Sequence, residues 1–440
     1  MRLPLILAVV LCTALAALQT KMIYKESTMK RMIREDRWDE YKAVKAERRA
    51  KLLKRRPELA SYPQNVLDYD DAEYIGHITI GTPDQDFLVI LDTASATLWV
   101  PDRECGQEMD DCEECLKYGE DECNFKCDDP FCCDTIHRGS LYREPKKRFG
   151  ACLHKHKFDP TKSTTFAPFP GDGWETGAAY GWLGMDTVRF GSVNETQLVI
   201  PKINFGQALD IDDGFYGDPS DGILGLGFTS LAVDHIIPPF ISAVNQKLVD
   251  QPIFSVFLKT DGQVEGQPGG VFTWGGIDTD NCAPVQAWMP LQAADYWVFK
   301  LKGVAVGNLS SVHEWNAISD TSSALIGGPA LVIGAIAKQV GAQYNLKYDM
   351  YIISCNATNG PDITMEIGQH NYTIPATNYI IPSGKANLCF MNFVNYNAQA
   401  FKPQWYIGNP LMRQYCHFYD VSKQRLGFAP PKTSAQTQTV

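Results

Sequence analysis

Short apolar runs alternate with turn-forming residues along most of the chain. From Tyr74 onward, segments rich in Val, Ile, Phe and Tyr are separated by Gly, Pro, Asn and Asp. Runs of about four to eight such residues between turn formers are typical of β-strands. The pattern therefore predicts a mainly β fold. The clearest expected strands are Tyr74–Ile80, Phe87–Leu91, Phe254–Leu258, Val271–Trp274 and Tyr348–Ser354.

Three segments carry helical signals instead. Pro239–Leu248 is one, and Pro329–Val340 is another, since it opens with proline and stops before Gly341. Proline is favoured in the first turn of a helix and glycine just past its end. Residues 26–56 are rich in Lys, Arg, Glu and Ala, a helical composition, and a proline follows them.

Residues 1–16 have the organisation of a secretory signal peptide. Arg2 precedes the apolar run Leu3–Leu11, and Ala14–Ala16 offers small residues for cleavage. The run is too short to span a bilayer. A buried N-terminal helix is the alternative. We expect a secreted protein (extracellular or in a gut lumen) or a lysosomal one, with no membrane anchor.

Cysteine usage fits export. The chain has 13 cysteines, and Cys12 would leave with the signal peptide, so six disulfides are expected. Residues 102–157 lack apolar periodicity and are interpreted as a surface insertion held by disulfides. The pair Cys112-x-x-Cys115 resembles half of a zinc site, but disulfides are favoured in an oxidising compartment, so no metal is expected. Eight cysteines lie in this insertion, at positions 105, 112, 115, 123, 127, 132, 133 and 152.

Four Asn-x-Ser/Thr sequons also fit a glycosylated, exported protein. They lie at Asn194, Asn308, Asn356 and Asn371.

Charge is distributed unevenly. Residues 21–56 hold 14 Lys/Arg and 6 Asp/Glu, whereas the whole chain has a net charge of −11. A basic arm ahead of an acidic body favours docking of the arm on the body. A solvated helix with no docking role is the alternative. The acidic body would repel phosphates, so nucleic acid is not expected as a partner.

One motif occurs twice. Val89–Ser95 and Ala317–Ser323 both place Asp-Thr-small-Ser after apolar residues. Each is followed later by an apolar-apolar-Gly triplet, Ile223–Gly225 and Tyr406–Gly408. Two copies of the same sequence pattern, one in each half of the chain, predict two similar lobes that face each other.

The duplicated motif contains two candidate catalytic carboxyls, Asp92 and Asp320. Carboxylates brought close together cannot both ionise easily, so one stays protonated. The ionised group can take a proton from water while the protonated group donates to a peptide carbonyl. A single Asp-Thr-x-Ser is more often a loop or helix cap, but matched duplication makes that interpretation unlikely.

At these residues the chain resembles the pepsin-like (A1-type) aspartic proteases, most closely the secreted nematode members. The resemblance implies two β-lobes with the active-site cleft between them, at 61–278 and 279–440. It also implies an inhibitory propeptide at 17–60, peptide or protein substrates, a monomer and no cofactor. The matching segments are Tyr74–Pro83, Leu98–Pro101, Phe158–Phe166, Asp221–Gly227, Phe254–Leu258, Gly275–Asp278 and Trp405–Leu411.

The resemblance assigns supporting roles to other residues. Thr93 and Thr321 would link the two Asp loops through hydroxyl-to-backbone bonds, while Ser95 and Ser323 would donate to the outer carboxylate oxygens. A flap is expected near 170–181, with Trp174 and Gly177 in it and Trp99 packed beside it. Cys355–Cys389 matches a family disulfide, Cys282–Cys416 follows by elimination, and the remaining eight cysteines would pair within the insertion.

Three departures from the family pattern matter. Ala94 and Ser322 stand where glycine is usual, and Trp174 or Pro170 replaces the flap tyrosine. Asn409 replaces a common aspartate, a change interpreted as structural. Two functions therefore remain open: an acid endopeptidase, or a catalytically inactive pepsin-fold glycoprotein that binds peptides or proteins. The sequence contains no Gly-x-Ser-x-Gly or His-Glu-x-x-His motif for other hydrolases.

Overall fold

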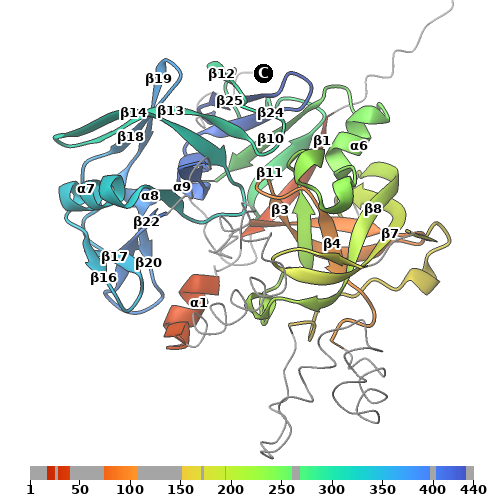
Figure 1. The fold of residues 1–440 in the computed structure, drawn as a ribbon. Helices are drawn as coiled ribbons and strands as arrows, with labels where there is room; N and C mark the ends of the chain where they lie inside the picture. Colours follow the sequence, from red (N-terminus) through yellow and green to blue (C-terminus); the bar gives the residue numbers. More distant parts are fainter. Residues whose placement is uncertain are drawn as a thin grey trace, which may run out of the picture.

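A computed structural model of the 440-residue chain shows a molecule built mainly from β-strands (Figure 1). It describes residues 17–24, 28–39, 74–106, 151–169, 173–193, 195–259, 268–396 and 403–432. The expected signal peptide and most of the cysteine-rich insertion, including Cys112 and Cys115, lie outside these residues. So do Pro170 and the sequon at Asn194.

The largest sheet has 14 strands and is shared between the two halves of the chain. Eleven of its strands come from the first half: β1 (Leu18–Tyr24), β2 (Tyr74–Ile80), β3 (Gln85–Asp92), β4 (Leu98–Pro101), β5 (Ala167–Pro168), β6 (Trp174–Glu175), β7 (Ala179–Phe190), β8 (Leu198–Ile211), β9 (Gly222–Gly225), β10 (Ile253–Leu258) and β11 (Pro268–Trp274). The second half contributes β12 (Ala287–Pro290), β24 (Cys416–Asp420) and β25 (Arg425–Ala429).

Two further sheets belong to the second half alone. A 7-stranded sheet holds β13 (Val298–Val306), β14 (Leu309–Ser319), β15 (Ile326–Gly328), β18 (Ile363–Ile367), β19 (His370–Ile374), β22 (Phe393–Asn395) and β23 (Trp405–Ile407). A 4-stranded sheet holds β16 (Gln343–Asn345), β17 (Met350–Ile353), β20 (Ile380–Pro382) and β21 (Cys389–Met391).

Helices are short and lie between strands. The α-helices of the described ranges are α1 (Thr28–Arg34), α6 (Pro239–Asn245), α7 (Ala330–Val340), α8 (Ala376–Tyr379) and α9 (Asn409–Met412). The 3₁₀ turns are η3 (Pro160–Lys162), η4 (Asp213–Phe215), η5 (Thr229–Leu231) and η6 (Val233–His235).

All five strands expected from the apolar pattern are present. Tyr74–Ile80 is β2, and the others fall within or around β3, β10, β11 and β17. The two expected helices of the body are α6 and α7. Gly341 ends α7 with φ 80°, a left-handed conformation that side chains disfavour. Within the basic arm, α1 lies inside the expected helical segment, but a turn at residues 35–36 ends it.

The duplicated motif reflects a duplicated strand arrangement. In the first half β3 pairs parallel with β9, β9 antiparallel with β4, and β4 parallel with β8. In the second half β14, β23, β15 and β22 repeat the same sequence of pairings. Each lobe therefore has a strand that ends at an Asp loop, with the glycine-containing triplet on the neighbouring strand.

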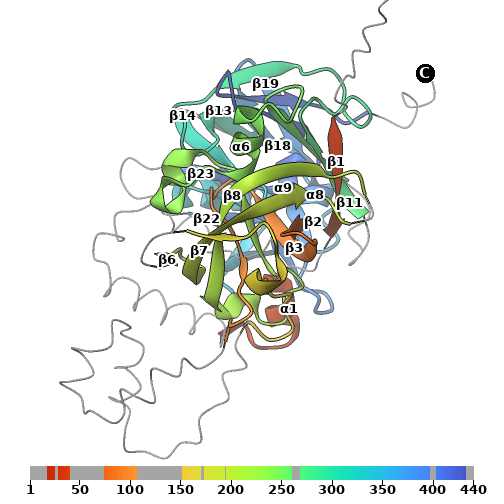
Figure 2. The same ribbon diagram turned by 90° about the vertical axis from the view of Figure 1, so that its right-hand side faces the viewer.

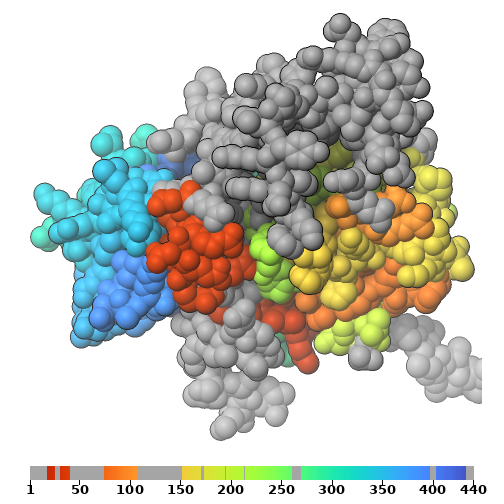
Figure 3. All heavy atoms as spheres, turned by 90° about the horizontal axis from the view of Figure 1, so that it is seen from below, coloured from red at the N-terminus to blue at the C-terminus, as the bar shows by residue number. Residues whose placement is uncertain are grey.

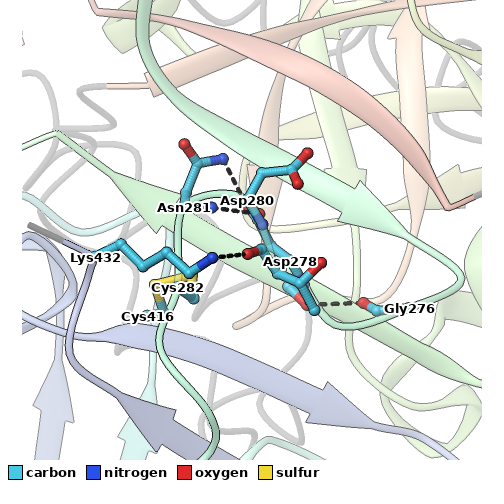
Figure 4. Close-up of a disulfide and its surroundings, with 9 residues drawn as sticks. Gly276, Asp278, Asp280, Asn281, Cys282, Cys416 and Lys432 are labelled. Atoms are coloured by element: carbon cyan, nitrogen blue, oxygen red, sulfur yellow. Dashed lines mark hydrogen bonds between the residues drawn. A yellow bond between two sulfur atoms is a disulfide. The ribbon is translucent and has the colours of Figure 1, made fainter. Parts of the chain in front are cut away.

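The two lobes are tied together through β10 and β24, which pair antiparallel. Asp278 lies in the segment between β11 and β12, where the chain passes from one half to the other (Figure 4). The Cys282–Cys416 disulfide anchors this segment, and Lys432 Nζ donates to Thr279 O at 2.6 Å. These contacts hold the segment between β11 and β12 against the end of the described chain.

The remaining disulfides also agree with the expected pattern. Cys355–Cys389 is present. Cys105–Cys152 closes the base of the cysteine-rich insertion, where Asp102 and Phe158 form a β-bridge. The insertion thus leaves and rejoins the body at adjacent points.

Strand β1 was not expected from the sequence. It pairs with β11 on one side and with β2 on the other (Figure 2). Thr20, Met22 and Tyr24 are buried in alternation, and Trp274 Nε1 donates to Thr20 Oγ1 at 2.8 Å. The beginning of the basic arm is therefore part of the shared sheet.

Candidate active site

Each lobe delivers one aspartate from the end of a strand. Asp92 is the last residue of β3, and Asp320 directly follows β14. Their exposed fractions are 0% and 1%. Asp92 O accepts from Leu226 N at 2.7 Å, and Asp320 N donates to Ile407 O at 3.0 Å. The backbone of each loop is thus bonded to the triplet strand beside it.

The glycine of each triplet permits this close approach. A Cβ on Gly225 would lie 2.4 Å from the carbonyl carbon of Ala96. A Cβ on Gly408 would lie 2.3 Å from the carbonyl oxygen of Ser323. Both distances are far below van der Waals contact, so only glycine allows the loop to cross the strand.

Thr93 and Thr321 join the two loops through four hydrogen bonds. Thr93 Oγ1 donates to Ser319 O at 2.7 Å, and Thr321 Oγ1 donates to Leu91 O at 2.6 Å. Thr321 N donates to Thr93 Oγ1, and Thr93 N donates to Thr321 Oγ1, both at 3.0 Å. These are the hydroxyl-to-backbone bonds that the resemblance implied. They place the two aspartates beside each other across the lobe boundary.

The hydroxyl donors to the carboxylates differ from those expected. Ser322 Oγ donates to Asp320 Oδ1 at 2.7 Å, and Ser322 N reaches the same oxygen at 2.9 Å. Ser323 Oγ instead donates to Leu325 O at 3.2 Å, so the donor role expected of Ser323 is wrong. The Ser323 hydroxyl also accepts a hydrogen bond from Leu325 N at 3.2 Å, so both of its bonds go to the backbone.

The environment of Asp92 is less symmetric than expected. Ala94 N donates to Asp92 Oδ1 at 2.7 Å. Ser95 Oγ makes no hydrogen bond of ordinary geometry to any residue that the structure describes, and its expected donation to Asp92 stays a prediction. The Ser95 hydroxyl nevertheless lies close enough to Asp92 to lower the pKa of that carboxyl.

Burial dominates the acid–base properties of the pair. Loss of water raises the pKa of Asp92, against the effect of nearby donors that include Ser95, Ala94 N–H and Ser322. Burial also raises the pKa of Asp320, and the negative charge of Asp92 raises it further. The pair therefore holds on to a proton where isolated carboxyls would both be ionised.

A hairpin of β6 and β7 forms at the position expected for the flap. Gly177 is exposed at its turn, where Thr176 N donates to Ala179 O at 2.8 Å. Trp174 does not have the expected orientation. Its exposed fraction is 2%, and its Nε1 donates to Trp182 O at 2.7 Å.

The reason for this orientation lies on the neighbouring strand. A Cβ on Gly206 would be 2.1 Å from the Trp174 ring, so glycine there creates the space that the indole fills. The expectation that Trp174 takes the place of the flap tyrosine is therefore corrected, because its side chain is buried and its N–H is bonded to the backbone. Trp99, also 2% exposed, packs in the same cluster and contacts Phe215 edge-on at 5.2 Å between centroids.

A buried polar group beneath the loops was missed from the sequence. Ser319 Oγ lies 2.9 Å from His417 Nδ1 and 2.8 Å from Tyr419 Oη. All three side chains are fully buried. Alternate polar residues in a short C-terminal strand carried no distinctive signal, because strand pairing alone determines that they face Ser319.

Helix α1 lies between the two lobes (Figure 3). Arg31 donates to the carbonyl of Tyr216 at 2.8 Å and to that of Gly217 in the first lobe. Met32 and Ile33 are 5% and 1% exposed, in a cluster that includes residues flanking the Asp320 loop.

The segment after α1 reaches the second lobe. Asp36 forms an ion pair with Lys385, and Trp38 Nε1 donates to Tyr348 O at 3.2 Å. The basic arm thus has specific contacts with both lobes.

These features define a bilobal fold with two buried aspartates contributed symmetrically, the architecture of pepsin-like aspartic proteases. The family model of eukaryotic aspartyl proteases matches residues 73–431. The chain is 39% identical to Aspartic protease 6 of Caenorhabditis elegans over 431 residues, or 97% of this chain and 98% of that protein. It is 40% identical to Aspartic protease 2 of Necator americanus over 411 residues, or 92% and 93%.

Pepsin A of Callithrix jacchus is 30% identical over 375 residues, 83% of each chain. The chain therefore belongs to the eukaryotic aspartyl protease family. The expected pepsin-like fold, the aspartic-type endopeptidase class and the resemblance to nematode members are confirmed at the level of the family.

Other expected features concern the surface. The three sequon residues that the structure describes, Asn308, Asn356 and Asn371, are exposed. Within the described ranges, no helix combines the length and apolarity required to cross a membrane.

Proposed function

We propose that the protein is an acid endopeptidase that uses Asp92 and Asp320 as a proton-sharing pair. The observation that carries the proposal is the geometry of the pair: both carboxyls are buried, and Thr93 and Thr321 bond the two loops together. Preorganised groups of this kind support catalysis because little reorganisation is needed during the reaction.

In the proposed reaction, one ionised carboxylate takes a proton from water as the water oxygen attacks the peptide carbonyl carbon. The protonated carboxyl gives its proton to the carbonyl oxygen. The resulting gem-diol collapses when the nitrogen takes a proton from the first carboxyl and the C–N bond breaks. A gem-diol hydroxyl returns a proton to the second carboxyl, so the pair regains its starting state.

The direct test is incubation of the whole chain at acidic pH with casein or haemoglobin, with and without a statine-type inhibitor. We expect cleavage that peaks below about pH 6 and that the inhibitor abolishes. Cleavage that is equally fast at neutral pH, or insensitive to the inhibitor, would contradict the proposal.

We also propose that residues 17–60 act as an inhibitory prosegment. The contacts of β1 within the shared sheet and of α1 with both lobes support this role. We propose that a base from Lys51–Arg56, a segment outside the described residues, approaches the pair at neutral pH. Acid treatment should yield a new N-terminus near residue 60, detected by N-terminal sequencing. A product that still begins near Ala17 and is active at neutral pH would contradict this.

The inactive binding protein remains the second candidate. Two features favour it. Ala94 and Ser322 replace glycine in the Asp loops, and the Trp174 side chain of the flap hairpin is buried and hydrogen-bonded to the backbone. Binding of the statine-type inhibitor without any cleavage would support it over the protease.

We propose export from the cell, as a secreted or a lysosomal protein. Three disulfides and three exposed sequon residues support this. Treatment with an N-glycosidase should increase the electrophoretic mobility of the protein produced by a eukaryotic host. An unchanged mobility would count against glycosylation at these sites.

A further inference from the structure

The hydroxyl of Ser322 occupies a position that the family pattern leaves to glycine. Its Oγ donates to Asp320 Oδ1 at 2.7 Å, and the N–H of the same residue adds a second bond to that oxygen at 2.9 Å. The equivalent residue in the other loop is Ala94, which offers only its N–H to Asp92. Position 322 therefore supplies a hydroxyl donor where the matching position of the other loop has a methyl group.

This donor replaces the one expected from Ser323, whose hydroxyl bonds to the backbone of Leu325. On the other loop, the Ser95 hydroxyl favours the ionised form of Asp92 but makes no hydrogen bond of ordinary geometry to a described residue. The Ser322 hydroxyl does make such a bond, to Asp320.

We propose that Ser322 is a positioning residue that acts through Asp320. Its hydroxyl fixes the rotation of the Asp320 carboxyl and stabilises the ionised form of that group. The inference rests on the proposed protease function, because it concerns the reaction of the same two carboxyls. A hydrogen bond donated to a carboxylate favours the charged form over the protonated one. Because Asp320 loses its proton next to the charge of Asp92, the alkaline limb of the pH profile should lie lower than it would without the hydroxyl.

Among the described residues, the other titratable groups near the pair are two tyrosines, a histidine and an aspartate. Burial raises the pKa of Tyr296 and of Tyr419 above the value of an exposed tyrosine. Burial lowers the pKa of His417, which touches the pair only through Ser319. Asp295, next to Tyr296, has a pKa raised by burial and titrates in every variant alike.

A purely structural role is the competing explanation. A serine that bonds to the aspartate two residues earlier can simply stabilise a turn. That role predicts a loss of stability on removal of the hydroxyl but no change in the protonation of the pair. The two explanations therefore differ in the pH profile.

The test compares the acid-activated parent with Ser322→Ala, Ser322→Thr and Ala94→Ser. A hydrogen bond to a charged group corresponds to a shift of about one pH unit or more. We expect Ser322→Ala to raise the alkaline limb of kcat/KM by about one unit, and Ser322→Thr to restore it. Ala94→Ser, which adds the matching hydroxyl beside Asp92, should move the acid limb to lower pH. A limb unchanged in Ser322→Ala, with a lowered Tm, would overturn the proposal.

A readout independent of cleavage separates this proposal from the protease function. Carboxyl carbons of ¹³C-labelled aspartate can be titrated by NMR in the parent, in Ser322→Ala, and in Asp92→Asn and Asp320→Asn to assign the signals. The same upward shift is expected in Ser322→Ala even if no substrate is cleaved. Absence of that shift would refute the role of Ser322, whereas absence of cleavage with the shift present would refute only the protease.

Discussion

Position 94 tests whether a Cβ is tolerated in the Asp loops. Ala94 is 3% exposed, and its N–H keeps a 2.7 Å bond to Asp92. The loop has therefore accommodated the methyl group without losing the backbone donor that glycine would supply. The threonine bonds between the loops are also in place.

Ala94→Gly should consequently change kcat/KM by less than about tenfold, or about 1.4 kcal/mol of barrier. The measurement is the rate of peptide hydrolysis by the acid-activated protein near its optimal pH. If the glycine variant were active and the parent inactive, the binding-protein alternative would replace the protease.

Two tryptophans on the flap hairpin, one buried and one exposed, allow a controlled comparison of stability. Trp174 is 2% exposed and fills the space above Gly206, whereas Trp182 is 44% exposed. Removing a buried aromatic side chain typically costs about 3–5 kcal/mol. Trp174→Ala should lower the free energy of unfolding by that order, as measured by urea denaturation, and Trp182→Ala should have a much smaller effect. Equal losses in the two variants would contradict the assigned orientation of the hairpin.

At the scale of elements, β24 carries an unusual buried base. His417 pairs in the sheet with Val256 on one side and Phe428 on the other. Its Nδ1 meets Ser319 Oγ, and its Nε2 has no hydrogen-bond partner among the described residues. Burial in this apolar setting lowers the pKa of His417 to about 3.

The sign of the resulting pH effect follows from linkage. An unfolded histidine takes up a proton below pH of about 6.5, while the folded one stays neutral until about pH 3. The stabilising contribution of neutral His417 is fully present above about pH 6.5 and is lost as the pH falls from there toward about 3. An enzyme proposed to work in acid therefore carries a group that weakens its fold there.

His417→Gln removes the titration and keeps a side chain that can bond to Ser319. Between pH 7 and pH 4, the parent should lose roughly 3 kcal/mol more free energy of unfolding than this variant. Urea denaturation at both pH values provides the measurement. His313→Gln, at an exposed position, is the control and should behave like the parent. A variant with the same pH dependence as the parent would show that His417 is not the group responsible.

Strands and helices of the body were predictable because their periods and breaks are local properties of the sequence. Tyr74–Ile80 and Pro329–Val340 are examples. Strand β1 was missed because Leu18–Tyr24 is a short segment without flanking turn signals, and only pairing with β11 and β2 makes it a strand. The donors of the Asp loops were misassigned for a related reason. Ser322 and Ser323 are adjacent, and only the three-dimensional turn decides which hydroxyl faces Asp320.

On the scale of the whole molecule, the basic arm holds contacts on both sides of the lobe boundary. Arg31 bonds to carbonyls of the first lobe, while Asp36 pairs with Lys385 of the second. The side chain of Lys385 lowers the pKa of Asp36 through a hydrogen bond and through its charge. Acid strong enough to protonate Asp36 would remove this ion pair.

Arg31→Ala should weaken docking of the arm, because hydrogen bonds from a charged donor contribute about 1.5–3 kcal/mol each. We expect the precursor to be processed about tenfold faster at a given acidic pH, as followed by gel electrophoresis. Lys21→Ala, on the exposed face of β1, serves as the control. Equal processing rates in the parent and in Arg31→Ala would argue against a restraining role for α1.

The central claim is that Asp92 and Asp320 act as one unit, and it is tested most directly by isosteric replacement of each. Hydrolysis of casein at acidic pH should be compared for Asp92→Asn, Asp320→Asn and the exposed control Asp362→Asn, with circular dichroism to verify folding. Either replacement within the pair should abolish cleavage in a folded protein, since the amide can neither take nor give the proton. The control should cleave like the parent. Full activity in a folded Asp92→Asn or Asp320→Asn protein would contradict the account.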